Sequence, residues 1–276
     1  MLNIHFFKKF PIIFFIALFS FNFSVQLHAE DDGVKKERSW RDFLRGGKNK
    51  KTIKGRTEDP IEDLQSNPEG IVDLVDMPTS NVIDYGGYRV NFRLYSEGGV
   101  VSHLSFGVFR HLNIGASWDN QKVIGTDNQS TNSPTLNIKL RAFDGSYILP
   151  SFTIGYEGQG RFFDKTIDQY REREKGLFLV MGRELFFPRL EFFGGINMAE
   201  FKDAKVLGSI GISYQVEQRL AVFTEYDNIR VGPENRWNAG VRIFPVPSLG
   251  IDFAFRRIAS NQDKERIVRI NYVGTF

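Results

Sequence analysis

A histidine and a serine two positions apart form the first pair of residues in this sequence that could carry out chemistry. His103 and Ser105 lie within Val100 to Phe109, a run in which apolar and polar residues alternate. Residues two apart on an extended strand share one face, and a histidine beside a serine can act as the base of a hydroxyl nucleophile. The pair permits a hydrolase. The alternative is that His103 and Ser105 simply belong to the polar inner face of a sheet and have no catalytic role.

Glu225 and Asp227 have the same spacing and could form the general acid and base of glycoside hydrolysis. Arginines on neighbouring segments favour an ion network instead. No catalytic residues are therefore predicted at this position. We expect no metal and no cofactor, because the chain has no cysteine and only four histidines, two of which fall in the first 29 residues.

Charged residues recur on one face of successive alternating segments. A charge cannot face lipid cheaply, so these residues must point into an enclosed lumen if the segments cross a bilayer. One interpretation is a paired ion network that plugs a narrow barrel. The other is a small pore or binding pocket, in which the basic majority favours anions. The predicted lumen-lining set is Arg89, Arg93, Lys139, Arg141, Glu157, Glu191, Glu225, Asp227, Arg242, Asp252, Arg256 and Arg269.

These residues would be positioned by twelve strands of about eight to eleven residues between Tyr85 and Phe276. In the last one, the apolar face carries Val268, Ile270, Tyr272, Gly274 and Phe276. A long amphipathic strand of this kind needs a sheet that closes over it. We expect it to close a barrel by pairing with Leu249 to Phe255 and with Tyr88 to Leu94.

The lengths of the connections support a barrel. The links after even-numbered strands are short, such as Arg110-His111, whereas the long links Asp119 to Pro134 and Gly158 to Lys175 follow odd-numbered strands. Bacterial barrels have an even strand number, short periplasmic turns and long outer loops. A soluble β-sandwich has no reason to sort its loops in this way.

Two segments precede the predicted barrel. Lys8 and Lys9 followed by an apolar run from Pro11 to Phe23 are typical of a secretory signal peptide, here residues 1–29. Residues 30–84 are rich in charge and lack periodicity, so we expect a flexible periplasmic segment that could bind a periplasmic partner.

Composition fits this organisation. The chain is 41% hydrophobic with a mean hydropathy of −0.28, too polar for a helical membrane protein, and it contains 27 Phe and 26 Gly among 276 residues. A transmembrane barrel alternates lipid-facing and lumen-facing residues and so averages to such a value. The net charge of +3 is too small to indicate nucleic-acid binding.

Several stretches resemble a family of uncharacterised bacterial outer-membrane barrels, which is similar in turn to the YjbH-type proteins associated with exopolysaccharide export. They include Met77-Pro-Thr-Ser, Tyr95-Ser-Glu-Gly-Gly99, Asn137 to Asp144 and Trp237 to Arg242. The terminal phenylalanine resembles the hallmark of such barrels and implies delivery to the outer-membrane insertion machinery. Lipid and lipopolysaccharide would then surround the protein.

The His-x-Ser pair also resembles that of outer-membrane phospholipases and lipid A deacylases. Those families follow the serine with asparagine and place the pair facing lipid. Here Phe106 follows, and the alternation sends His103 and Ser105 inward. A lipid-modifying enzyme is therefore the alternative to the main prediction.

The sequence thus predicts an all-β protein with one transmembrane antiparallel barrel over residues 85–276. We expect it to act in the bacterial outer membrane as a narrow channel or a structural or binding protein, without catalysis. The resemblance implies a link to surface polysaccharide export.

Overall fold

The computed structural model describes residues 71–126, 128–146, 149–164, 169–173, 175–199, 205–229, 235–259 and 264–276. The chain divides into two units, 1–43 and 44–276, and every described residue belongs to the second. The predicted signal peptide and the predicted segment 30–70 lie outside the described residues. No helix among the described residues is long and apolar enough to cross a membrane.

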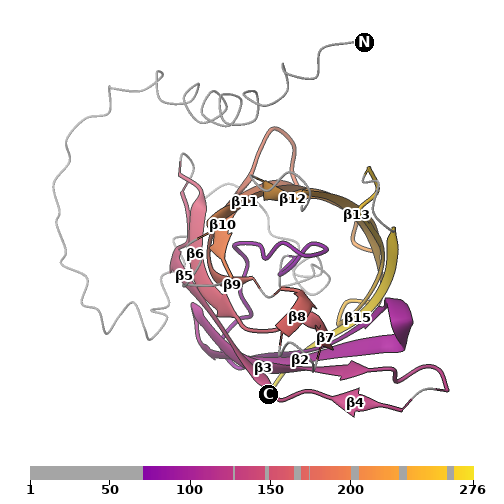
Figure 1. Ribbon diagram of the computed structural model, residues 1–276. Coiled ribbons are helices and arrows are strands. Elements are labelled where there is room, and N and C mark those ends of the chain that lie inside the picture. Colours follow the sequence, from indigo (N-terminus) through magenta and orange to yellow (C-terminus); the bar gives the residue numbers. More distant parts are fainter. Residues whose placement is uncertain are drawn as a thin grey trace, which may run out of the picture. The chain divides into compact units, whose positions relative to one another are not determined.

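Twelve antiparallel strands form one closed sheet, drawn as a ring in Figure 1. Closure follows from two pairings: β15 pairs with β1, and β2 pairs with both β1 and β3. The strands are β1 (Gly87–Tyr95), β2 (Gly99–Phe109), β3 (Leu112–Gln121), β5 (Thr135–Phe143), β6 (Ser151–Glu157), β9 (Gly176–Glu184), β10 (Leu190–Met198), β11 (Leu207–Glu217), β12 (Leu220–Ile229), β13 (Arg236–Val246), β14 (Leu249–Arg256) and β15 (Glu265–Thr275).

Three further strands and one short helix lie in the connections. Strand β4 (Ser130–Thr131) pairs with the last two residues of β3. Strand β7 (Arg161–Asp164) pairs with β8 (Gln169–Glu172) in a separate hairpin. The 3-10 helix η2 (Ser96–Gly98) joins β1 to β2. The sequence did not predict these elements, because each is too short to show a periodic pattern.

The predicted twelve-stranded barrel is confirmed. The closing strand pairs as expected, with Val268 opposite Leu94 on β1 and opposite Phe253 on β14. We call the end of the barrel with connections such as 110–111 and 218–219 the short-turn end. The other end, where 122–134 and 158–175 connect the strands, is the long-loop end.

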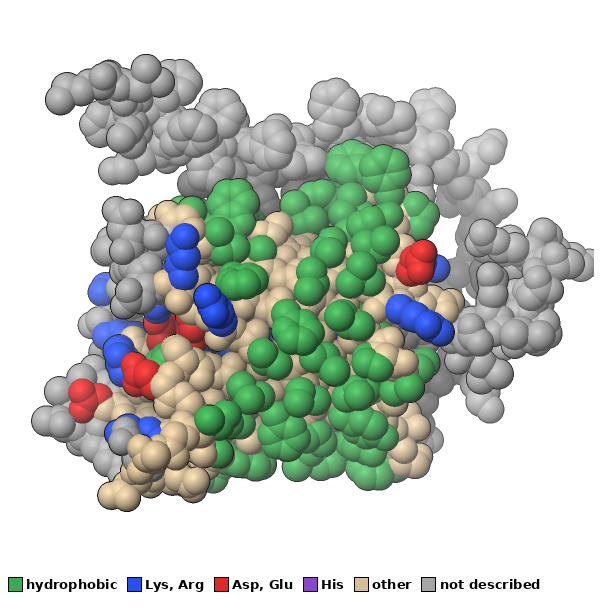
Figure 2. All heavy atoms as spheres, turned by 90° about the vertical axis from the view of Figure 1, so that its right-hand side faces the viewer, with side chains coloured by type: hydrophobic (Ala, Val, Ile, Leu, Met, Phe, Trp, Pro, Cys, Tyr) green, Lys and Arg blue, Asp and Glu red, His purple; other side chains and the backbone are tan. Residues whose placement is uncertain are grey.

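The outer face of the barrel is apolar because most outward-facing residues on the strands are large hydrophobic ones. Ile154, Ile212, Phe253 and Ile270 all have more than a third of their surface exposed. Figure 2 shows apolar side chains covering the middle of one face, with charged side chains toward its two ends. Such a belt can be stable only against lipid, because water would make its exposure unfavourable.

Residues 71–84 lie inside this barrel, so for them the prediction of a flexible periplasmic segment is wrong. In Figure 1 the indigo chain runs within the ring of strands. Residues 71–79 form a hairpin closed by backbone hydrogen bonds from Thr79 N to Val72 O (3.0 Å) and from Leu74 N to Met77 O (2.9 Å). We call residues 71–79 the lumen hairpin. Its sequence gave no signal because so short a hairpin, buried on all sides, has no amphipathic period.

The barrel wall makes room for the lumen hairpin at a glycine. A Cβ atom on Gly211 of β11 would lie 2.3 Å from Leu74 Cδ1 and 3.2 Å from Met77 Sδ. Any larger residue would therefore push the hairpin away from β11. Close approach of two backbones is a common reason for glycine inside a strand.

The lipid-facing belt predicts a depth-dependent cost for charge. Arginine in place of Ile212, in the middle of β11, should destabilise the barrel in lipid vesicles by lowering its free energy of unfolding by about 2–4 kcal/mol. Val216→Arg on the same face lies next to the 218–219 turn and should cost about 0–1 kcal/mol. Denaturant titration in vesicles measures both, and equal costs for the two variants would contradict a bilayer at this height.

Candidate functional site

One face of the lumen hairpin is held by an apolar patch of the barrel wall. Leu74 and Met77 are fully buried, and Val75 is 1% exposed. They belong to one apolar cluster with wall residues from strands β9 to β15: Phe178, Val180, Phe193, Ala221, Phe223, Phe244, Ala254 and Ile267. Burying a large aliphatic side chain contributes about 1.5–3 kcal/mol, so these contacts anchor the tip to that side of the lumen.

The backbone of the hairpin tip donates to a single carboxylate on β12. Glu225 accepts hydrogen bonds from the amides of Val75 (3.0 Å), Asp76 (2.8 Å) and Met77 (3.0 Å). Asn238 Nδ2 donates to the same carboxylate at 2.7 Å. A buried tip without such an acceptor would leave three amides unsatisfied, at about 1–3 kcal/mol each. Glu225 is thus a docking residue for the hairpin.

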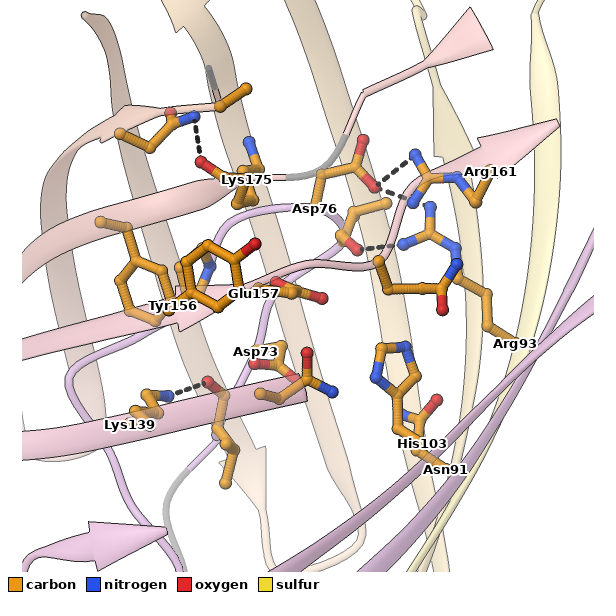
Figure 3. A pocket seen from close by; sticks show the side chains of 18 of the residues that line it. Asp73, Asp76, Asn91, Arg93, His103, Lys139, Tyr156, Glu157, Arg161 and Lys175 are labelled. Carbon is orange, nitrogen blue, oxygen red and sulfur yellow. Dashed lines mark hydrogen bonds and ion pairs between the residues drawn. The ribbon is translucent and has the colours of Figure 1, made fainter. Parts of the chain in front are cut away.

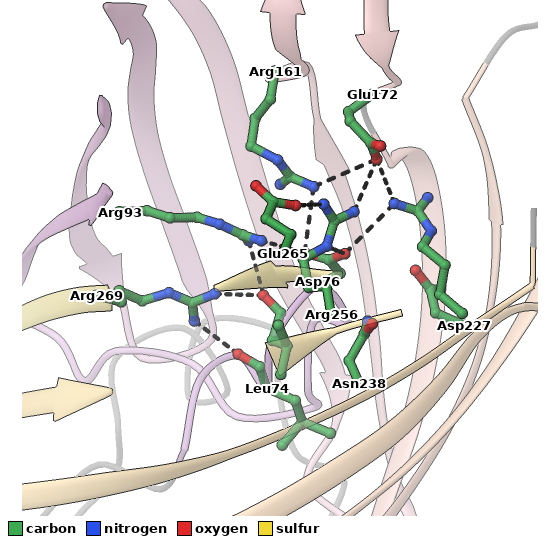
Figure 4. Close-up of polar contacts among 12 residues, drawn as sticks. Leu74, Asp76, Arg93, Arg161, Glu172, Asp227, Asn238, Arg256, Glu265 and Arg269 are labelled. Atoms are coloured by element: carbon green, nitrogen blue, oxygen red, sulfur yellow. Dashed lines mark hydrogen bonds and ion pairs between the residues drawn. The ribbon is translucent and has the colours of Figure 1, made fainter. Parts of the chain in front are cut away.

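The Asp76 carboxylate at the tip lies among four arginines from four elements (Figure 4). One oxygen is 2.7 Å from Arg93 of β1 and 3.4 Å from Arg161 of β7. The other is 2.6 Å from Arg256 of β14 and 3.7 Å from Arg236 of β13. Burial by itself would raise the pKa of Asp76, but the four arginines hold it well below its usual value.

The second hairpin carboxylate, Asp73, pairs with the wall in the same way. Arg89 of β1 approaches it at 2.5 Å and also donates to Asn271 at 2.7 Å. Burial favours a higher pKa for Asp73, but the charges of Arg89, Lys139 and Arg269 outweigh it and lower the pKa. Both hairpin carboxylates are therefore ionised at neutral pH.

Wall cations also bind the carbonyl groups of residues 72–80. The contacts are Lys139 to Val72 O (2.9 Å), Arg242 to Asp73 O (3.2 Å), Arg269 to Leu74 O (2.7 Å), Arg93 to Val75 O (2.9 Å) and Arg141 to Ser80 O (3.0 Å). Arg269 also donates to Val75 O. Hydrogen bonds from charged donors contribute about 1.5–3 kcal/mol each. The predicted lumen arginines thus bind a segment of their own chain.

All twelve predicted lumen residues are buried or half-buried, and they fall into three groups. Arg89, Arg93, Lys139, Arg141, Glu225, Arg242, Arg256 and Arg269 contact residues 71–80. Asp227 and Asp252 pair with wall cations: Lys175 lies 2.6 Å from Asp227, and Arg242 lies 2.6 Å from Asp252. Glu157 lines a cavity, and Glu191 accepts from Ser213 at 3.4 Å.

Sequence reasoning missed several members of this network. Asp73 and Asp76 lie in the segment without periodicity, and Arg161 and Glu172 lie in the long connection between β6 and β9. Glu265 shares the alternation of Arg269 on β15 and could have been found from it. It pairs with Arg256.

Three carboxylates come close enough to hold a metal ion. Asp76, Glu225 and Asp227 each offer an oxygen, and these oxygens lie within 4.8 Å of one another. Arginines surround Asp76, amides occupy Glu225, and Lys175 neutralises Asp227. Because a cation here would have to displace bound cations, the geometry favours the ion network over a metal centre.

His103 and Ser105 both line the lumen cavity, whereas Phe106 faces outward and is 37% exposed. Figure 3 shows the His103 ring beside Asn91, on the inner side of the wall. Lipid in the bilayer contacts the opposite face of β2. The pair thus lacks the lipid-facing placement of the outer-membrane lipid hydrolases.

A cavity of about 370 Å³ remains between the lumen hairpin and the wall. Part of its lining is drawn in Figure 3, where Arg93, Lys139 and Arg161 surround Asp73 and Asp76. Among the described residues, eleven lysines and arginines but only four carboxylates line it. Two of those four belong to the hairpin itself. The lumen is therefore an electropositive chamber.

Among known proteins, solved structures with a similar fold match this chain. No protein-family model matches the chain, and no curated protein matches it. Solved structures with similar folds include the KdgM porin in complex with disordered oligogalacturonate (7% identity, 69% of this chain and 99% of that chain, TM-score 0.44). The Acinetobacter baumannii outer membrane protein Omp33 (10%, 70% and 99%, TM-score 0.40) and Salmonella typhi OmpF complexed with daunomycin (8%, 68% and 96%, TM-score 0.29) are others.

Identities of 7–10% with TM-scores below 0.5 carry no argument about function. The assignment rests on the chain itself. A closed antiparallel sheet with an apolar outer belt and a charged lumen is the architecture of a transmembrane β-barrel. The protein is a transmembrane β-barrel of the kind found in bacterial outer membranes.

Neutralising Asp76 should loosen the hairpin. Asp76→Asn leaves four arginines around an uncharged side chain, and breaking a buried ion pair costs about 3–5 kcal/mol. A cysteine in place of fully buried Met77 would be the only cysteine in the chain and should react slowly with a maleimide. Adding Asp76→Asn should speed its labelling about 100-fold or more. Asp84→Asn, in the same segment but exposed, is the control, and equal labelling rates in all three backgrounds would refute the role of Asp76.

The two lowered pKa values also predict an acid limit for docking. Because Asp73 and Asp76 titrate below the ordinary carboxyl value of about 4, their contribution is complete above that pH. It is lost only as the pH falls through their native pKa values. Ion current through the barrel in planar bilayers should therefore stay constant from pH 7 to about 4 and rise below it. A rise that is complete by pH 5 would assign the transition to other groups.

Proposed function

We propose that this barrel is an outer-membrane channel for anionic solutes, and that the lumen hairpin closes it at rest. One observation carries the proposal: a segment of the chain itself occupies the lumen and is held there by the basic residues of the wall. A barrel whose only task were structural could fill its lumen with wall side chains, as small barrels do.

The held segment is suited to removal without unfolding of the barrel. The lumen hairpin contributes no strand to the closed sheet, and its one described β-bridge joins Asp73 to Pro78 within the hairpin. All twelve barrel strands keep their ladders when the hairpin leaves. Its departure would cost the apolar contacts of Leu74 and Met77 and the ion pairs of two carboxylates. It would also break the hydrogen bonds that Glu225 and the wall cations make to the hairpin backbone, which water and solute anions would have to replace.

The charge of the vacated wall supports selectivity for anions. The cavity lining carries eleven basic residues among the described ones, and of the four acidic ones only Glu157 and Glu172 remain when the hairpin leaves. Rings of arginine and lysine are the usual lining of anion-conducting pores. Passage of a cation would require several uncompensated like-charge contacts.

The proposal has a more specific version, in which the channel serves surface polysaccharide export. It draws support from the resemblance of the barrel sequence to YjbH-type proteins and from the basic lumen, which would accept acidic sugars. Cells that lack the protein should then carry less acidic polysaccharide on their surface. Unchanged surface uronic acid would remove this role and leave the channel intact.

Single-channel recording tests the gate. The wild-type protein in planar bilayers should show rare openings at neutral pH, whereas Asp76→Asn should be open most of the time with a reversal potential that indicates anion selectivity. Asp84→Asn should behave as wild type. Large currents from the wild type that Asp76→Asn leaves unchanged would contradict closure by the hairpin.

A further inference from the structure

The surroundings of Asp76 contain more positive charge than this one carboxylate can neutralise. In the described part of the chain, five arginines pair directly with three carboxylates here; the arginines are Arg93, Arg161, Arg236, Arg256 and Arg257, and the carboxylates are Asp76, Glu172 and Glu265. Two more carboxylates lie close to Asp76: Glu225 accepts the hairpin amides, and Asp227 is neutralised by Lys175. When the hairpin leaves, Glu225 is released, and five arginines then face three carboxylates, which leaves an excess of positive charge. Such a site would bind another anion strongly in its place.

Two of these guanidinium groups have spare donors. Among the described residues, nothing accepts a hydrogen bond from the Nε atoms of Arg93 and Arg161, which are both buried, and Arg93 as a whole is only 5% exposed. Both residues line the cavity. A buried N–H without an acceptor costs about 1–3 kcal/mol, and an anion with more oxygens than a carboxylate could satisfy these donors.

Basic residues continue from the site toward the long-loop end. Arg161 and Glu172 belong to the β7–β8 hairpin, and Arg171 and Arg173 of the same connection, together with Lys205 before β11, also line the cavity. In Figure 4, Arg161 and Glu172 lie directly beside Asp76 and Arg256. These basic residues at the mouth would attract an anion and lead it toward the tip of the lumen hairpin.

We propose that Asp73 and Asp76 mimic a polyanionic ligand, which enters at the long-loop end and opens the barrel by displacing them. The inference rests on the proposed function. It adds the chemical class of the ligand and the event that opens the channel. The ligand carries several carboxylate or phosphate groups, the chemistry that arginine binds best.

The positions of the two wall arginines set the size of the ligand. Asp73 binds Arg89 and Asp76 binds Arg93, four residues apart on one face of β1. At about 3.3 Å per residue these positions are roughly 13 Å apart along the strand. A monoanion could replace one carboxylate only. A linear ligand with acidic groups spread over this length could replace both.

The test uses the full-length protein with Met77→Cys as the reporter of undocking. Maleimide labelling is followed at constant ionic strength while linear hexaphosphate, hexaglutamate or the neutral sugar maltohexaose is added. Either polyanion should raise the labelling rate at least tenfold, and maltohexaose should not. The polyanion with the lower half-maximal concentration identifies phosphate or carboxylate as the preferred group.

Direct binding gives a second test of the competition between Asp76 and the polyanion. Asp76→Asn removes the internal competitor, so the half-maximal polyanion concentration for direct binding, measured by calorimetry, should fall about 100-fold, as the docked state loses the same factor. In Asp84→Asn it should stay as in the wild type. Gel mobility before and after heating verifies that each barrel is folded.

Polyanions that leave labelling unchanged, or that bind the wild type and Asp76→Asn equally, would overturn the inference. The proposed function fails by a different result, namely currents that do not depend on Asp76. The labelling and binding measurements require no ion flow, so the two failures can be told apart.

Discussion

The ion pairing of Asp76 inside the barrel is the interaction on which the rest of the lumen depends. Arg93, Arg161 and Arg256 reach it from elements far apart in sequence, and none of them could be buried so deeply without an anion among them. Conversely, the carboxylate could not stay ionised in the lumen without the arginines. The hairpin and the wall therefore neutralise each other.

Two further contacts convert this pairing into a defined position. The apolar side chains of Leu74 and Met77 direct one face of the hairpin toward β11 and its neighbours, where Gly211 leaves space. Glu225 accepts the three tip amides and fixes the depth of insertion. Dispersion, backbone hydrogen bonding and charge pairing each hold a different side of the same nine residues.

The sequence predicted the barrel well because alternation along strands is a local property. The barrel strands other than β9 were predicted from period-two patterns, and the same parity placed Arg93 and Arg269 on the inner face. The alternation is unclear in β9, where Phe178 and Val180 are apolar on the inner face because they pack in the cluster that holds the hairpin. The hairpin could not be predicted. Its burial arises from contacts with residues some 150 to 190 positions away, such as Glu225 and Arg269, and no local pattern records such contacts. For the same reason, the partner of the lumen arginines was not evident.

The most direct test of hairpin docking is a disulfide between the hairpin tip and the wall in intact membranes. The chain has no cysteine, so Leu74→Cys with Gly211→Cys introduces one isolated pair. The Leu74→Cys change removes the Cδ1 atom that a side chain at position 211 would otherwise strike, so the two thiols can meet without displacing the hairpin. Leu74→Cys with Ser117→Cys is the matched control, because Ser117 is a buried residue of nearly the same size as cysteine that contacts Thr135 and Asn137 of β5. A docked hairpin predicts rapid oxidation of the 74–211 pair and little of the 74–117 pair. Equal or absent cross-linking in both would contradict a lumen closed by residues 71–79.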